Sequence, residues 1–141
     1  MKKTALIALA LLISSIASAA PGQTGGAAAT TLIDALKAMG VPSQTIAYDH
    51  IYSAQDLECS RERDGAGVKK YICTLSTAGA HMGLTKEGTV ARRLFGALIL
   101  NGFDVYADVA GLATVSAKTV DCNAYEQIKG QIAPNCQFYI P

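Results

Sequence analysis

Apolar residues near the start of the chain recur with the period of a helix. The residues spaced as i, i+3, i+4 and i+7 are Leu32, Ala35, Leu36 and Met39. Such a stripe is typical of an amphipathic helix that buries one face, and it predicts a helix over Thr30–Met39. Residues 20–27 before it are rich in glycine and polar residues, so we expect a flexible leader there.

A second helix is predicted from Thr85 or Lys86 to Asn101, with Thr85 as its N-cap. Its last part, Leu94–Leu100, is almost unbroken apolar sequence. A helix that is apolar all round is buried on several sides. We therefore expect this helix to be less exposed than the first, with Phe95 and Ile99 contacting the other half of the chain or a second chain. An oligomer formed through this helix would satisfy the same pattern.

Each predicted helix is followed by a glycine and then by an apolar residue. These pairs are Gly40–Val41 and Gly102–Phe103. Glycine adopts positive φ without steric penalty, and an apolar residue behind it packs back on the last turn of the helix, as in the Schellman motif. The sequence therefore predicts that both helices end at these glycines.

β-Branched and aromatic residues predict strands over Thr45–Tyr52 and Phe103–Val109. Two further runs, Ala54–Glu62 and Val68–Thr77, flank the turn sequence Asp64–Gly67 and predict a hairpin. Residues two apart in a strand share a face. A turn centred on Ala66 then predicts the facing pairs Leu57 with Leu75, Cys59 with Cys73, and Arg61 with Tyr71.

In the second half, pairing Cys122 with Cys136 places Val120 opposite Phe138. The connection there differs, because Asn123–Glu126 resembles a capping box and Gly130 is a possible helix end. We expect an irregular or helical excursion over Asn123–Gly130.

The two halves of the chain resemble each other. The segment Ser53–Cys59 is similar to Ser116–Cys122. Cys73 follows Cys59 by the same number of residues as Cys136 follows Cys122. Internal similarity of this kind is the sign of a repeat architecture. We therefore expect two repeats, about 28–77 and 85–141, each a helix followed by strands.

Strands that follow a helix without regular alternation indicate the α+β class. We predict a single α+β domain over residues 28–141, with its helices packed on an antiparallel sheet. Two αβ repeats with a disulfide each are similar in outline to the secreted inhibitors of β-lactamase, although no motif of theirs is matched residue by residue. The likeness concerns the fold alone.

Residues 1–19 have the three parts of a secretory signal peptide. Lys2 and Lys3 precede the apolar stretch Thr4–Ala17, and Ala17–Ala19 is a small-residue cleavage site. We expect cleavage after Ala19 and a periplasmic or secreted protein. No later stretch is apolar for long enough to span a membrane.

The four cysteines all follow this segment. An even number of cysteines in an exported chain predicts disulfides, and the hairpin register favours Cys59–Cys73 and Cys122–Cys136. The chain contains no metal-binding or cofactor-binding motif that we recognise.

The charge of the chain argues against nucleic acid as a partner. The formal net charge is +1, and removing Lys2 and Lys3 with the signal peptide leaves −1. Proteins that bind phosphate backbones carry a clear basic excess.

Histidine chemistry is a weaker hypothesis. His50 has Asp49 and Ser53 near it in sequence, but neighbours in a strand point to opposite faces, and a triad requires spatial geometry. His81 and Met82 would supply an incomplete soft-metal site. A small secreted hydrolase that uses His50 or His81 remains the enzymatic alternative, and no catalytic residue is assigned.

The hairpin tip is the segment that the sequence singles out for binding. Its basic residues are Arg61, Arg63, Lys69 and Lys70. A disulfide at its base would brace the loop, and a braced loop loses less entropy on docking. We therefore expect an exported disulfide-bonded binding protein with a protein partner, for example an enzyme inhibitor; an envelope structural or assembly subunit is a further alternative.

Overall fold

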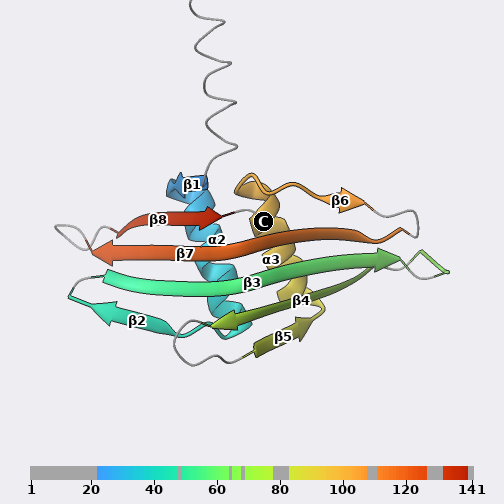
Figure 1. Cartoon of the computed structure of the whole chain (residues 1–141), viewed down its shortest axis with the longest axis horizontal. Coiled ribbons are helices and arrows are strands. Elements are labelled where there is room, and N and C mark those ends of the chain that lie inside the picture. Colours follow the sequence, from blue (N-terminus) through green and yellow to red (C-terminus); the bar gives the residue numbers. More distant parts are fainter. Residues whose placement is uncertain are drawn as a thin grey trace, which may run out of the picture.

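The computed structural model describes residues 22–47, 49–63, 65–67, 69–77, 83–107, 111–126 and 132–139. Within these residues, α2 (Gly26–Met39) and α3 (Thr89–Leu100) lie side by side on one face of an antiparallel sheet (Figure 1). The predicted α+β class, with two helices packed on an antiparallel sheet, is confirmed. No helix of the described part is long and apolar enough to cross a membrane.

The sheet of the described residues has eight strands. They are β1 (Gly22–Gly25), β2 (Ser43–Ile46), β3 (Asp49–Arg63), β4 (Lys69–Thr77), β5 (Gly83–Glu87), β6 (Tyr106–Ala107), β7 (Ala113–Glu126) and β8 (Ile132–Tyr139). The order across the sheet is β1-β8-β7-β3-β4-β5, while β2 pairs with β3 and β6 with β7. The long strands β3 and β7 therefore form the centre (Figure 1).

Both helices end as predicted. Gly40 has a φ of 98° and Gly102 a φ of 93°. The N–H of Val41 donates to the carbonyl oxygen of Leu36 at 3.1 Å, and the N–H of Phe103 donates to that of Leu98 at 3.1 Å. These are the bonds of a Schellman motif, so the same local sequence produces the same stop twice.

The predicted helix starts were wrong. Helix α2 begins at Gly26, and residues 22–25, expected as part of a flexible leader, form β1 against β8. Helix α3 begins at Thr89, because Thr85, the expected N-cap, lies in β5 and pairs with Thr74 of β4. In both places another strand, β8 for β1 and β4 for β5, supplies hydrogen-bond partners that the local sequence does not reveal.

Two predicted strands also differ from the structure. The strand over Thr45–Tyr52 is interrupted, since β2 ends at Ile46 and β3, which pairs with it, begins at Asp49. The strand expected over Phe103–Val109 is reduced to Tyr106–Ala107, with residues 108–110 outside the described part.

The capping box expected at Asn123–Glu126 does not form. Strand β7 continues through these residues in register with β8, which gives their backbone a ladder of partners. Gly130 lies outside the described residues.

Both disulfides join the cysteines that were predicted. Cys59 faces Cys73 with their Cα atoms 4.1 Å apart, and Cys122 faces Cys136 at 4.0 Å. Their sulfur atoms lie beneath the helices. The Sγ of Cys73 is 3.3 Å from the carbonyl oxygen of Ala91 in α3, and that of Cys136 is 3.8 Å from the carbonyl oxygen of Ala29 in α2.

One predicted facing pair is absent from the ladder of the described strands. Leu57 does not pair with Leu75, because the register between β3 and β4 shifts between Gln55 and Glu58, where Asp56 has a φ of 49°. Both leucines are nevertheless buried, as expected. The pairs Arg61–Tyr71 and Val120–Phe138 are confirmed.

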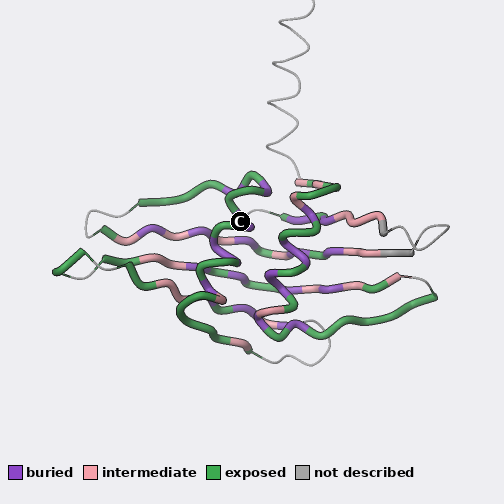
Figure 2. The backbone as a smooth tube through the Cα atoms, turned by 180° about the vertical axis from the view of Figure 1, so that it is seen from behind, coloured by how far each residue is buried: buried purple, intermediate pink, exposed green. Residues whose placement is uncertain are grey.

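The core lies between the helices and the sheet (Figure 2). Its largest fully buried apolar side chains include Leu32, Leu36, Met39, Leu57, Leu94, Leu98, Val115 and Val120. Phe95 contacts Tyr71 edge-on, which confirms its expected contact with the first half of the chain. Within this chain α3 is not buried on several sides: Ile99 is 43% and Leu100 59% exposed, because only one side of α3 faces the sheet. A contact of Ile99 with a second chain stays a prediction.

A buried asparagine joins the two helices. The side-chain amide of Asn101 donates to the carbonyl oxygen of Ala28 at 2.9 Å and to that of Ala97 at 2.7 Å. Its Oδ1 accepts a hydrogen bond from the hydroxyl of Thr24 in β1. The end of α3 is thereby fixed to the start of α2 and to the first strand.

Candidate functional site

The β3–β4 hairpin extends past its neighbours in the sheet. On one side, Arg61 is the last residue of β3 that pairs with β7; on the other, Ile72 of β4 pairs with the end of β5 at Glu87. Beyond them, the pairs Glu62–Lys70 and Arg63–Lys69 join β3 to β4 alone. The hairpin therefore ends in a two-stranded ribbon at one end of the molecule (Figure 1).

Arg61 lies at the base of this ribbon and is half-buried, so it differs from the exposed tip residue that was expected. Its guanidinium carbon is 5.6 Å from the ring centre of Phe95 in α3. Its buried Nε has no hydrogen-bond partner. Stacking of arginine on an aromatic face is stabilising, and Arg61 therefore braces the hairpin against the helix layer.

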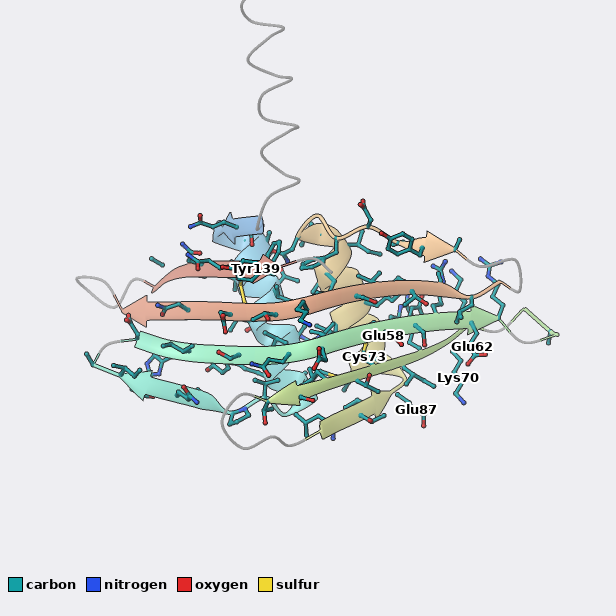
Figure 3. The ribbon with its side chains drawn as sticks, viewed as in Figure 1. Glu58, Glu62, Lys70, Cys73, Glu87 and Tyr139 are labelled. Atoms are coloured by element: carbon teal, nitrogen blue, oxygen red, sulfur yellow. A yellow bond between two sulfur atoms is a disulfide. The ribbon has the colours of Figure 1, made fainter. Side chains whose placement is uncertain are left out.

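The other three basic residues of the predicted site are exposed. Arg63 and Lys69 share the helix side of the sheet with Arg61, since residues two apart lie on one face and Lys69 faces Arg63. Lys70 lies on the opposite side, where its Nζ is 3.4 Å from Oε1 of Glu87 (Figure 3). An exposed ion pair of this kind contributes little to stability.

Sequence reasoning missed one cation of the site. A hollow of about 330 Å³ beside the hairpin is lined by Lys69, Lys70, Tyr71, Gly88, Thr89 and Arg92. Arg92 comes from the first turn of α3, and the pairing of β4 with β5 brings that turn to the hairpin. The sequence predicted that this helix starts at Thr85 or Lys86, so it did not place Arg92 in the first turn. The first turn of α3 also carries no acidic residue.

Among the described residues, no catalytic arrangement occurs that would support the histidine hypotheses. His50 is exposed, and its Nδ1 lies 3.3 Å from the hydroxyl oxygen of Thr45. Asp49 and Ser53 lie on the other face of β3, as the alternation of side chains requires. His81 and Met82 are outside the described residues, within which no group of three or more potential metal ligands occurs.

Another hollow, of about 510 Å³, lies between the two helices. Its lining residues are Thr31, Asp34, Ala35, Thr89, Arg92, Arg93, Gly96 and Ala97. Arg92 borders both this groove and the hollow at the hairpin. The cationic surface therefore continues from the hairpin onto the first turn of α3.

Comparison of the chain with protein-family models, with curated proteins and with solved structures found no match. The similarity in outline to secreted β-lactamase inhibitors therefore stays an expectation from the sequence.

Proposed function

We propose that this chain is an exported binding protein whose β3–β4 hairpin docks into an acidic pocket of a protein partner, as the loop of an enzyme inhibitor does. One observation carries the proposal. The hairpin projects past β5 and β7 with Arg63 and Lys69 exposed, and Lys69 lines a hollow together with Arg92 of α3. Arginine pairs with carboxylates through two parallel hydrogen bonds, which suits Arg63 as the anchor.

The hairpin is well suited to docking because its base is held by two contacts. The disulfide Cys59–Cys73 closes its base. Two residues further along β3, Arg61 packs on the ring of Phe95. Ordering a loop opposes association, so a loop ordered in advance binds more tightly. The tip residues Gly65–Gly67 are exposed beyond this base, where a partner can reach them.

Export is part of the proposal. Residues 1–19 would act as a signal peptide that is removed after Ala19, which would leave the chain in the periplasm or outside the cell. The two disulfides fit a small exported protein, because such bonds persist in oxidising compartments.

We also propose that the chain contains two repeats. The strand outside β3 is β4 and the strand outside β7 is β8, and each is joined to its inner neighbour by a disulfide. Beyond them lie the short strands β5 and β1, which lead into α3 and α2. Each disulfide also lies under the helix of the other half. This likeness supports a βαβββ unit, β1–β4 and β5–β8, in which each first strand pairs with the other copy.

The docking proposal is tested by capture of partners on immobilised, oxidised protein of residues 20–141. The baits are the wild type, the Arg63→Ala/Lys69→Ala variant, and a control variant, Lys37→Ala/Lys118→Ala, which removes two exposed cations outside the hairpin. Wild type and control should enrich the same envelope or extracellular protein, and the hairpin variant should not. Equal enrichment by all three baits would reject the hairpin as the binding element.

A second candidate is an envelope assembly subunit. It is favoured by exposed apolar residues between the end of α3 and β6, namely Ile99, Leu100, Val105 and Tyr106. Sedimentation of wild type and of Ile99→Ser/Leu100→Ser tests it. An oligomer that the substitutions dissociate would support assembly, and a monomer in both cases would oppose it.

A further inference from the structure

The sheet face turned away from the helices contains a polar hollow. The helices cover one face and leave the other open (Figures 1 and 2). On the open face, a hollow of about 370 Å³ is lined by Ile51, Asp121, Cys122, Asn123, Asn135 and Gln137. A volume of this size falls within the range of small-molecule sites.

Strand pairing fixes the side chains of this hollow. Asn123 of β7 faces Asn135 of β8, and Asp121 faces Gln137 on the same side of the sheet. Ile51 of β3 faces Asn123 from the other side. The rung between the two polar pairs is the disulfide Cys122–Cys136, whose side chains are buried on the core face. The polar groups are therefore held on a covalently braced part of the sheet.

One acceptor in the hollow lacks a partner. The Oδ1 atom of Asn123 is buried and accepts no hydrogen bond. Its neighbour Asn135 accepts a long bond of 3.5 Å from the amide of Gln23. Buried polar atoms are nearly always hydrogen-bonded, and an unpaired one costs free energy that a suitable donor would recover. A rotation of the Asn123 side chain that turns this oxygen into the hollow would let a ligand hydroxyl supply that donor.

We propose that this hollow binds a small, neutral, polyhydroxylated compound, with the chemistry of a sugar. The three amides lining it offer both donors and acceptors, and Asp121 adds a carboxylate acceptor. A hydroxyl group both donates and accepts, so a polyol satisfies all of these groups together. The half-buried Ile51 provides an apolar surface for the C–H face of such a ligand.

Charged ligands match the lining less well. An anion would meet the carboxylate of Asp121, and no lysine or arginine is among the lining residues. An ammonium group carries donors only, so the amide N–H groups would find no acceptor on it. The lining therefore selects for neutral hydroxyl groups.

This site is independent of the hairpin. Ile51 lies near the opposite end of β3 from Arg63, the last residue of the strand. The first half also provides a matched control, because the rungs that flank Cys59–Cys73 carry Ser60 opposite Ile72 and Glu58 opposite Thr74. Glu58 is an exposed acid on the same open face (Figure 3), as Asp121 is.

The experiment is a titration of oxidised protein of residues 20–141, followed by saturation-transfer NMR and calorimetry. The probes are glucose, galactose, mannose and a neutral dextran, with acetate and spermidine as charged compounds. At least one neutral saccharide should bind, and Asn123→Ala and Gln137→Ala should each weaken it about tenfold or more, because each removes a side-chain amide that hydrogen-bonds the ligand. Glu58→Ala should leave binding unchanged.

Using both variants keeps the test decisive if one of them folds poorly, because Gln137 is exposed and its truncation leaves the core intact. Binding of the monosaccharide would identify a free sugar as the ligand source, and binding of dextran alone would identify a polysaccharide. The proposal is overturned if no neutral saccharide binds, if only acetate or spermidine binds, or if the variants match wild type. Hairpin variants should retain full saccharide binding, so this test and that of the docking proposal fail separately.

Discussion

The guanidinium carbon of Arg61 lies 5.6 Å from the ring centre of Phe95 and so joins the base of the hairpin to α3. Arg63, two residues further along β3, is exposed at the tip. The two arginines of one strand therefore have different surroundings: Arg61 packs against the helix layer, and Arg63 is exposed to solvent.

This difference predicts the effects of two alanine substitutions. Arg61→Ala should lower the free energy of unfolding by about 1 kcal/mol, because it removes a partly desolvated cation–π contact and the packing of the side-chain stem. Arg63→Ala should change it by less than about 0.5 kcal/mol, as exposed positions usually do. Urea unfolding of both variants checks the prediction, and equal losses at the two positions would contradict it.

The glycines at the helix ends should resist replacement. Gly40→Ala and Gly102→Ala should each destabilise the protein by about 1 kcal/mol, since φ is positive at both positions. A Cβ at Gly102 would meet no atom within 4 Å, so backbone strain alone accounts for the loss. Gly96→Ala, in the middle of α3 and equally uncrowded, should instead stabilise by about 0.5–1 kcal/mol. If all three variants shift the urea midpoint in the same direction, the capping argument fails.

Removal of either disulfide should be costly. Each closes a loop with a sequence separation of 14 residues, for which the chain-entropy model gives about 3 kcal/mol. Cys59→Ala/Cys73→Ala and Cys122→Ala/Cys136→Ala should both show a lower urea midpoint than the wild type. Non-reducing peptide mapping of the wild type supplies the control, and a peptide that joins Cys59 to Cys122 or Cys136 would contradict the pairing.

Asn101 should be the most sensitive polar residue of the core. It is 3% exposed and donates to carbonyl oxygens of both helices. Asn101→Ala should cost about 1–3 kcal/mol, because buried backbone acceptors lose their donors. Asn101→Asp should be no better, since a carboxylate cannot donate to those carbonyls. Thermal unfolding of both variants is compared with that of Thr24→Ala, which removes only the hydrogen bond to Oδ1 of Asn101. The comparison separates this bond from the two that the Asn101 amide donates. A wild-type melting temperature for Asn101→Ala would refute the stabilising role of Asn101.

The sequence predicted those features of the fold that depend on nearby residues. The Schellman stops at Gly40 and Gly102 and the register of Cys59 with Cys73 follow from local spacing, and all were found. The starts of α2 and α3 were wrong because β1 and β5 exist only through their pairing with β8 and β4. A glycine-rich segment carries no local signal of a distant partner strand.

The candidate site likewise combines features that nearby residues determine with features that depend on strand pairing. The hairpin and its basic residues were visible as a run of sequence, but Arg92 joins them only after β5 pairs with β4. The half-burial of Arg61 depends likewise on Phe95 in the helix layer. The polar hollow was not foreseen, because Asn123 was assigned to a helical excursion and its rung with Asn135 requires β7 to continue through it.

Calorimetry with the captured partner measures whether the hairpin tip binds an acidic pocket of a protein partner. Arg63→Ala should weaken binding by about 2 kcal/mol or more, as a hot spot does, while the melting temperature stays at the wild-type value. The Lys37→Ala/Lys118→Ala control should bind as the wild type does. Wild-type affinity in a variant with Arg63, Lys69 and Lys70 all replaced by alanine would contradict the account.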